Sequence, residues 1–259
     1  MCIRDRDNVG EVKNSGVEVA LDATLLDRSD LEWSTRLTYS HLTSEITELA
    51  APIAIGGRGL QEHREGYPFG AYFMYPVTLE GDQVVVADER EFVGQPTPSY
   101  TGALSSTLSL FDGRVRIYGL LEYMGGHKTV NYTETYQCRT AFGTCKARFE
   151  KDANGNLTEM ARLKGDPAAN FQSYHFTYDA DFAKLRQVSV NISVPGQWTR
   201  YLGAASGDFG IVASNLFTIT DYPGTDPEIN SQGRENASQR EFFSAGVPSA
   251  LSFRLSLVY

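Results

Sequence analysis

The sequence predicts an all-β fold, specifically a partial antiparallel transmembrane β-barrel with long extracellular loops. Seven segments alternate apolar and polar residues with a period of two, which is the pattern of a strand with two different faces. Most of them run for about 9–11 residues, the length of a tilted strand that crosses a bilayer, whereas strands of soluble proteins typically have about 5–6. Short and long connections also alternate strictly along the chain, as in outer-membrane barrels.

The seven alternating segments give the order of the expected strands. In chain order they are residues 17–25, 31–39, 100–110, 114–124, 183–194, 209–216 and 251–259. The short connections are 27–30, 111–113 and 195–207, and the long ones are 44–99, 125–173 and 217–248. If the last strand ends on the periplasmic side, every short connection falls on that side and every long one becomes an extracellular loop.

The last segment shows the alternation most clearly. Leu251, Phe253, Leu255, Leu257 and Tyr259 share one face, while serine and arginine occupy the other. An alternating strand that ends on an aromatic residue resembles the assembly signal of outer-membrane barrels. The candidate signal residues are therefore Phe253, Leu255, Leu257 and Tyr259, and the barrel assembly machinery is an expected partner.

Charge and motif content argue against several functions. The formal net charge is −9, so nucleic acid is not an expected partner, because phosphate binding needs a clustered basic surface. No apolar run approaches about 18 residues, so no transmembrane helix is expected. Hydrolase and nucleotide-binding motifs are absent, and the scattered histidines follow no metal-ligand spacing. We therefore expect no enzyme activity, no cofactor and no metal.

The first residues and the cysteines bear on the compartment. The opening MCIRDR has charges without a following apolar core, resembles translated adapter sequence, and leads us to expect a non-native leader at 1–6 and native barrel sequence at 7–259. Cys138 and Cys145 enclose six residues, and a disulfide between them in an oxidising compartment is the preferred interpretation. Two free thiols, or a metal site with too few ligands, are the alternatives.

Four stretches carry a family resemblance. Residues 180–189 (ADFAKLRQVS) resemble the F-x-K-L-R-x-V-S strand of SusC/RagA-type TonB-dependent receptors, and residues 214–228 (SNLFTITDYPGTDPE) resemble the N-L-x-T-x-T-D-Y-x-G-x-D-P-E segment of that family. Residues 8–18 (NVGEVKNSGVE) are similar to its entry strand, and residues 65–70 (EGYPFG) to a surface loop. The four occur in the family's order. One departure is 242–248 (FFSAGVP), where the family has an aromatic-Pro pair before the final strand.

The resemblance implies a barrel of about 22 strands with an N-terminal plug in the outer membrane. It implies import of glycan or peptide fragments, driven by the TonB complex through the plug and assisted by a SusD-like lipoprotein. This chain would supply about seven membrane-crossing strands, with outer-membrane lipid on one face and an oligosaccharide or peptide substrate near the loops. The plug would lie outside it. Seven strands cannot close, so we expect the chain alone to aggregate or to need detergent.

Two sets of residues are candidates for function. Charges on the polar strand faces should line the lumen, because an arginine facing lipid costs roughly 2–4 kcal/mol at the midplane. These lumen-facing candidates are Glu18, Asp22, Glu32, Arg36, Arg116, Glu122 and Arg254. They contact substrate or plug, or are simply solvated. Loop aromatic residues that could stack on sugar rings, or merely pack within the loops, are Tyr67, Phe69, Tyr72, Phe73, Tyr75, Tyr132 and Tyr136.

Local signals inside the loops predict turns. Gly81-Asp82 predicts a hairpin over residues 72–86. Residues 152–158 resemble part of a calcium loop, but the glycine is misplaced and an Asn-Gly turn is preferred. Asp226-Pro227-Glu228 offers oxygen ligands for a cation, and a turn suffices to explain it.

Two rival functions share part of this pattern. A passive porin or adhesion barrel would have the same strands, and a plug in the full-length protein would distinguish an importer from it. A secreted β-rich carbohydrate-binding or hydrolytic domain would be recovered in a soluble fraction rather than in membranes.

Overall fold

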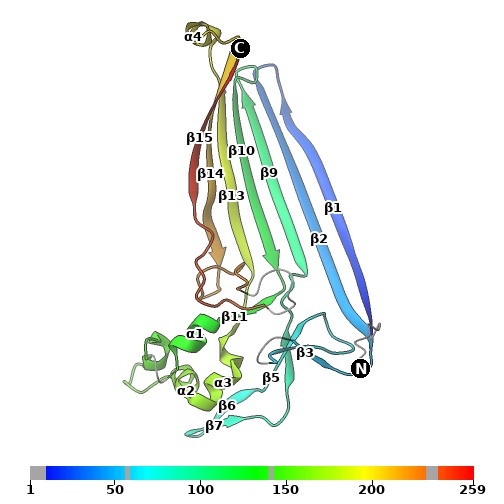
Figure 1. Cartoon of the computed structure of the whole chain (residues 1–259), viewed down its shortest axis with the longest axis vertical. Coiled ribbons are helices and arrows are strands. Elements are labelled where there is room, and N and C mark those ends of the chain that lie inside the picture. The colour runs from blue at the N-terminus through cyan, green and yellow to red at the C-terminus, as the bar shows by residue number, and fades with distance from the viewer. Residues whose placement is uncertain (1–9, 56–58, 140–142, 232–238) are drawn as a thin grey trace, which may run out of the picture.

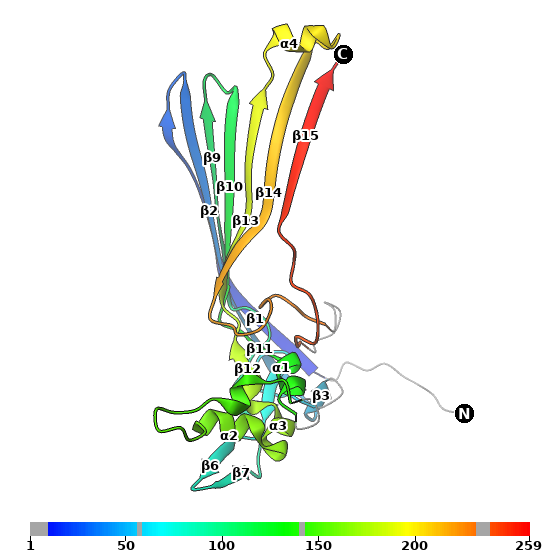
Figure 2. The same cartoon turned by 90° about the vertical axis from the view of Figure 1, so that its left-hand side faces the viewer.

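A computed structural model describes residues 10–55, 59–139, 143–231 and 239–259. It has two parts along its long axis, a tall curved sheet and a cap of small sheets and short helices at one end of it (Figures 1 and 2). The expected leader at 1–6 lies outside the described residues.

The tall sheet has seven antiparallel strands, and each pairs only with the tall-sheet strands before and after it in the chain. They are β1 (Gly10–Asp27), β2 (Leu31–Leu49), β9 (Tyr100–Leu110), β10 (Val115–Gly125), β13 (Phe182–Ser193), β14 (Ser206–Thr220) and β15 (Ala250–Val258). All seven predicted strands are therefore present, in the predicted order. The strands β1 and β2 are longer than predicted, because they stay paired through polar stretches where the period-two alternation ends.

Strand register gives the tall sheet an apolar and a polar face. Residues that are paired across strands project to the same side. One such row joins Trp33, Leu108, Ile117, Val190, Ile211 and Phe253. The next row on the opposite side joins Glu32, Ser109, Arg116, Asn191, Gly210 and Arg254. The period-two pattern of the sequence is thus kept across the whole sheet.

The connections separate by length. The short ones, 28–30, 111–114 and 194–205, lie at the end where β15 finishes, and the long ones lie at the cap end (Figures 1 and 2). The link after β13 contains the helix α4 (Gly196–Tyr201), which was not predicted. It begins directly after Pro195, whose fixed φ suits the start of a helix.

The cap contains the small elements. Its strands are β3 (Ile53–Ile55), β4 (Gln61–His63), β5 (Ala71–Met74), β6 (Val77–Glu80), β7 (Gln83–Val86), β8 (Glu91–Gly94), β11 (Lys128–Val130) and β12 (Thr177–Asp179). Its helices are α1 (Tyr132–Gln137), η1 (Lys146–Phe149), α2 (Glu159–Gly165), α3 (Pro167–Gln172) and η2 (Tyr174–Phe176). Among the described residues, no helix is long and apolar enough to cross a membrane.

The hairpin expected over residues 72–86 is shorter in the structure. The turn at Gly81 joins only β6 to β7, whereas Tyr72 belongs to β5, which pairs with β4 and β8. Gly81 has a φ of +59°, which a glycine adopts without strain. The turn signal was therefore right, but the strand before it is interrupted at residues 75–76.

Each of the helices α1, α2 and α3 begins at a residue whose side chain accepts a hydrogen bond from the first turn. The side chains of Asn131, Thr158 and Asp166 accept backbone N–H groups at the starts of α1, α2 and α3. The Asp152 carboxylate likewise accepts N–H groups of Asn154 and Asn156, which makes the predicted turn. In the stretch that resembles a calcium loop, the Asp152 carboxylate thus forms hydrogen bonds with the backbone.

The buried apolar side chains lie mainly in the cap. One cluster contains Tyr72, Met74, Val130 and Tyr132, and a second contains Val77, Leu163 and Ala169. In the tall sheet, by contrast, most described side chains are exposed or half-buried, because nothing in the structure packs on either face over most of its height. The two parts join at the cap end of the tall sheet, which we call the wall.

Candidate functional site

The polar face of the tall sheet carries all the charges that were expected in the lumen. Following the register from strand to strand places Glu18, Asp22, Glu32, Arg36, Arg116, Glu122 and Arg254 on that one face. Asp22 and Arg36 lie opposite each other with their charged atoms 3.4 Å apart. Both are exposed, so this pair contributes little to stability, and the face remains a solvated, charged surface.

A cluster of five charged side chains lies on the polar face at the cap end. We call Glu122, Lys184, Arg186, Asp226 and Glu228 the wall–loop ion cluster. The ammonium of Lys184 donates to Asp226 at 3.0 and 3.1 Å and to Glu228 at 2.5 Å. The Arg186 guanidinium donates through two nitrogens to Glu228 and through a third to Glu122 at 2.5 Å. The two cations come from β13 and two of the anions from the loop after β14.

A β-bulge assembles the cations of this cluster. Leu120 of β10 pairs with Gln187, but the next residue, Leu121, pairs with Leu185, so Arg186 is an extra residue in β13. A bulge lets two successive residues project to the same face, and Arg186 therefore reaches Glu122 on the polar side. The apolar face is undisturbed, because Leu185 still lies opposite Phe217.

Burial makes the cluster a fixed connection rather than a surface pair. The Lys184 side chain is 2% exposed and that of Asp226 is 8% exposed. Asp226 also accepts the backbone N–H groups of Glu228 and Val247, which holds both ends of the loop 221–249. Burial raises the pKa of Glu228, but hydrogen bonds from Arg186 and Lys184 outweigh it and hold the pKa below its ordinary value.

A second buried carboxylate ties the same loop to the helices. Glu241 accepts hydrogen bonds from the hydroxyls of Tyr222 at 2.6 Å and Thr133 at 3.1 Å. Its backbone pairs with Val130 and Tyr132. Burial, followed by the adjacent Glu241, raises the pKa of Tyr222, so the phenol stays protonated and donates. The loop is therefore anchored both to the wall and to α1.

The apolar face has aromatic residues toward both of its ends. Near the short connections Trp33 lies on this face, and Phe111, Trp198, Tyr201 and Tyr259 are exposed at the same end of the sheet, outside its strands. Near the cap lie Tyr39, Tyr100 and Tyr123, which the register places in adjacent rows of the same face. Leu37, Leu104 and Leu121 form a row between them. Six residues separate Trp33 from Tyr39, which corresponds to about 20 Å along a strand.

Comparisons with known proteins point to one family. The chain is 24% identical over 295 residues to the TonB-dependent receptor P3 of Formosa agariphila, covering 96% of this chain and 29% of that protein. It is 22% identical over 284 residues to the TonB-dependent receptor SusC of Bacteroides thetaiotaomicron, covering 96% and 26%. The structure of the RagAB peptide transporter matches 85% of this chain and 27% of its own, with a TM-score of 0.70 and 20% identity. The chain is similar to SusC/RagA-type TonB-dependent receptors over most of its length.

The match has a defined extent. No protein-family profile matches the chain. The segment spans between a quarter and a third of the length of the two curated receptors. Its sheet has the fold of the RagAB barrel wall, which confirms the predicted antiparallel β class.

Two of the stretches that resemble SusC/RagA motifs meet in the structure. Lys184 and Arg186 belong to the stretch 180–189, and they bind Asp226 and Glu228 of the stretch 214–228. The sequence offered a cation site at residues 226–228 as an alternative to a turn. In the structure, Lys184 and Arg186 bind these carboxylate oxygens instead. The sequence did not predict this pairing, because strict alternation would put Lys184 and Arg186 on the same face as Val188, and only the bulge moves them to the polar face.

Several of the candidate loop aromatic residues are unavailable to a ligand in this structure. Tyr72 and Tyr132 are buried in the first core cluster of the cap, and Phe73 is buried beside Tyr67. For these three residues the structure shows the packing alternative, because they are large apolar groups that fill the small cap core. Tyr67, Tyr75 and Tyr136 are half-buried, and Phe69 is exposed with its ring against His63.

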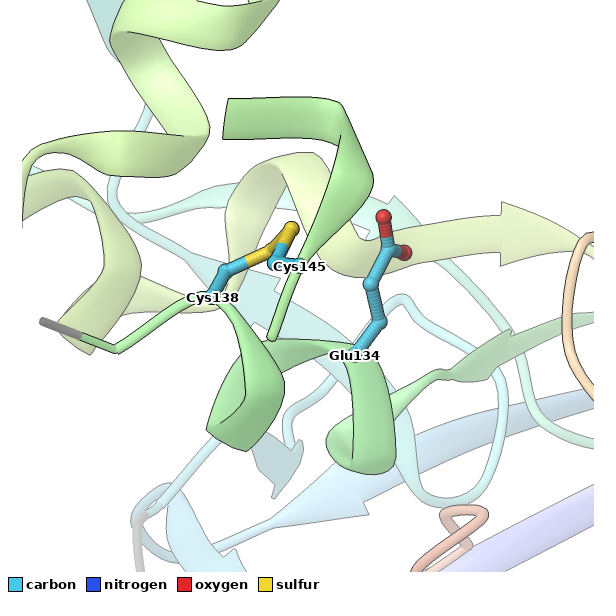
Figure 3. A group of neighbouring side chains, drawn as sticks. All are labelled: Glu134, Cys138 and Cys145. Carbon is cyan, nitrogen blue, oxygen red and sulfur yellow. A yellow bond between two sulfur atoms is a disulfide. The ribbon is translucent and has the colours of Figure 1, made fainter. Parts of the chain in front are cut away.

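Cys138 and Cys145 form a disulfide in the structure (Figure 3). With Glu134 they are close enough to hold a metal ion, but sulfur atoms that are bonded to each other are not free as ligands. The Glu134 carboxylate is also engaged, at 2.6 Å from both the Lys164 ammonium and the Tyr178 hydroxyl. This arrangement supports a structural role for the group in joining α1 to its neighbours.

Proposed function

We propose that this segment forms part of the wall and extracellular loops of an outer-membrane, TonB-dependent importer of glycan or peptide fragments. The observation that carries the proposal is the two-faced sheet: an uncovered apolar face with aromatic residues toward both ends, and a charged face opposite. An outer-membrane barrel needs an apolar band about 25 Å tall between aromatic girdles and a polar interior. The printed names of the relatives, receptors and a peptide transporter, support the same function.

The apolar face requires an apolar environment. Leu37, Leu104 and Leu121 are exposed on it, as are Phe253 and Leu255. A continuous apolar surface of this size on a soluble monomer would favour aggregation. We therefore assign lipid to this face, water to the opposite face, and the outer membrane as the location.

The roles of the parts follow from these assignments. The charged face borders the lumen and contacts water, the plug or the passing substrate, and it performs no chemistry. The cap lies outside the cell and is the part positioned to contact a glycan or peptide and a SusD-like lipoprotein. The wall–loop ion cluster holds one extracellular loop at the mouth of the lumen. The TonB complex acts through a plug elsewhere in the full-length receptor.

The test uses the full-length receptor in its own bacterium. Deleting its gene should abolish growth on one class of oligosaccharide or peptide, and the wild-type gene should restore growth only when TonB is present. Fractionation should recover the receptor in the outer membrane. Uptake that persists without TonB would indicate a passive porin, and recovery of the intact protein in the soluble periplasm would rule out the barrel.

A further inference from the structure

The helix α4 has an unusual composition for a link at the end of the sheet where the short connections lie. Between Pro195 and Gly207 the single charged residue is Arg200, and the link also contains Trp198, Tyr201 and Leu202. These three large side chains are 61%, 91% and 57% exposed. A polar turn of a few residues would be enough to reverse the chain, as the turn at 28–30 does at the same end of the sheet. The exposed aromatic residues therefore need an explanation.

Packing places α4 over the apolar face rather than over the lumen. Gly207 lies opposite Leu257, and both belong to the apolar face of the sheet. A Cβ atom on Gly207 would point to that face and would approach the Thr199 methyl group to 3.1 Å. Thr199 is fully buried, and this methyl contact fixes the side of the sheet on which α4 lies.

Hydrogen bonds hold the link in this position. Ala204 donates its N–H to the Thr199 carbonyl at 3.0 Å, and Ala205 donates to Val258 of β15 at 2.6 Å. The Thr199 hydroxyl donates to the Gly196 carbonyl at 3.2 Å. The helix is thus bound to the ends of both β14 and β15, while its aromatic side chains remain exposed.

We infer that α4 lies in the membrane–water interface on the side of the short connections, where Trp198, Tyr201 and Leu202 insert into the lipid surface. Thr199 of the same helix packs on the apolar face beside Gly207, which lies opposite Leu257, so α4 adjoins the face that is assigned to lipid. Tryptophan and tyrosine favour the interface, because an apolar ring enters the acyl boundary while its N–H or O–H group stays hydrated. Arg200 adds a cation beside the phosphate groups of the lipids. This inference rests on the proposed outer-membrane location.

The test measures depth with a fluorescent label on single cysteines in the full-length receptor. The positions are Trp198→Cys, Phe253→Cys as a deep control on the apolar face, and Ser29→Cys as an aqueous control in the turn at the same end. Each protein is reconstituted in phosphatidylethanolamine–phosphatidylglycerol vesicles that carry a nitroxide either on the headgroup or deep in the acyl chain. Iodide in the buffer reports exposure to water.

The expected quenching separates the inference about α4 from the proposed membrane location of the sheet. At position 198 the headgroup nitroxide should quench about twofold more than the deep one, and at position 253 the order should reverse, as for an interfacial and a buried site. If position 253 responds to lipid but position 198 is quenched only by iodide, like position 29, α4 lies in water and the inference is wrong. Protection of position 198 from both quenchers would indicate a protein cover instead and would also overturn it. A position 253 without lipid quenching would contradict the proposed function itself.

Discussion

The tall sheet and the cap differ in how they are stabilised. In the sheet, most side chains remain exposed on one face or the other, so backbone pairing holds it together, and in the proposed function lipid covers its apolar face. In the cap, short strands and helices enclose buried side chains such as Tyr72, Met74 and Phe176, and a disulfide joins two of its segments. The cap is therefore stabilised by its own buried side chains and disulfide, whereas the tall sheet needs an environment that covers its apolar face. The wall–loop ion cluster is where the two meet.

The largest effect is expected from breaking the wall–loop ion cluster. The substitution Lys184→Met leaves Asp226 buried without its ammonium partner, and losing one partner of a buried pair costs about 3–5 kcal/mol. The full-length receptor should lose thermal stability, and the loop 221–249 should become sensitive to protease. Arg116→Met, an exposed charge on the same face, is the matched control and should change neither. Unchanged protease sensitivity in Lys184→Met would show that the cluster does not hold the loop.

The next effect tests the assignment of the two faces. Leu37→Arg places a charge on the apolar face between its aromatic residues, and the expected cost is roughly 2–4 kcal/mol with reduced recovery in the outer membrane. Thr38→Arg places the same charge one residue further on the polar face and should be tolerated. Recovery and heat-dependent unfolding on gels measure both variants. Equal tolerance of the two would contradict lipid on the apolar face.

A smaller effect should stay within the cap. Replacing Cys138 and Cys145 together by alanine removes a closed loop, at a cost of about 2–3 kcal/mol in the chain-entropy account. Proteolysis of the cap should increase, while heat-dependent unfolding of the barrel on gels should not change. A parallel loss of barrel stability would mean that the two parts are more tightly coupled than their separate packing indicates.

The smallest effect concerns pH. Because the folded pKa of Glu228 is below its ordinary value, its stabilising contribution is present above the unfolded pKa and is lost as the pH falls through the folded one. Protection of the loop 221–249 from an acid-active protease should therefore begin to fall as the pH drops through the ordinary carboxyl range and should continue to fall below it. Glu228→Gln should flatten this decline. A decline that is already complete at the ordinary value would contradict the pairing with Arg186 and Lys184.

The wall could be predicted from sequence and the cap could not, for physical reasons. A strand between two different solvents must alternate, so residues such as Leu251 and Arg254 report their faces directly. The helices α1, α2 and α3 have six or seven residues and depend on single capping side chains, such as Thr158, which give no periodic signal. The partners Lys184 and Asp226 are 42 residues apart, and only the folded loop brings them together. Aromatic residues in a loop, such as Tyr72, look the same in sequence whether they are buried or exposed.

The ion cluster also limits how such a receptor can diversify. Each wall strand pairs only with its neighbours in the wall, so most connections can lengthen, shorten or be exchanged without shifting the register of any strand. The connection 221–249 is the exception, because Asp226 and Glu228 must still reach two cations fixed on β13. The length of this loop and the residues at positions 184 and 186 of β13 can therefore change only together.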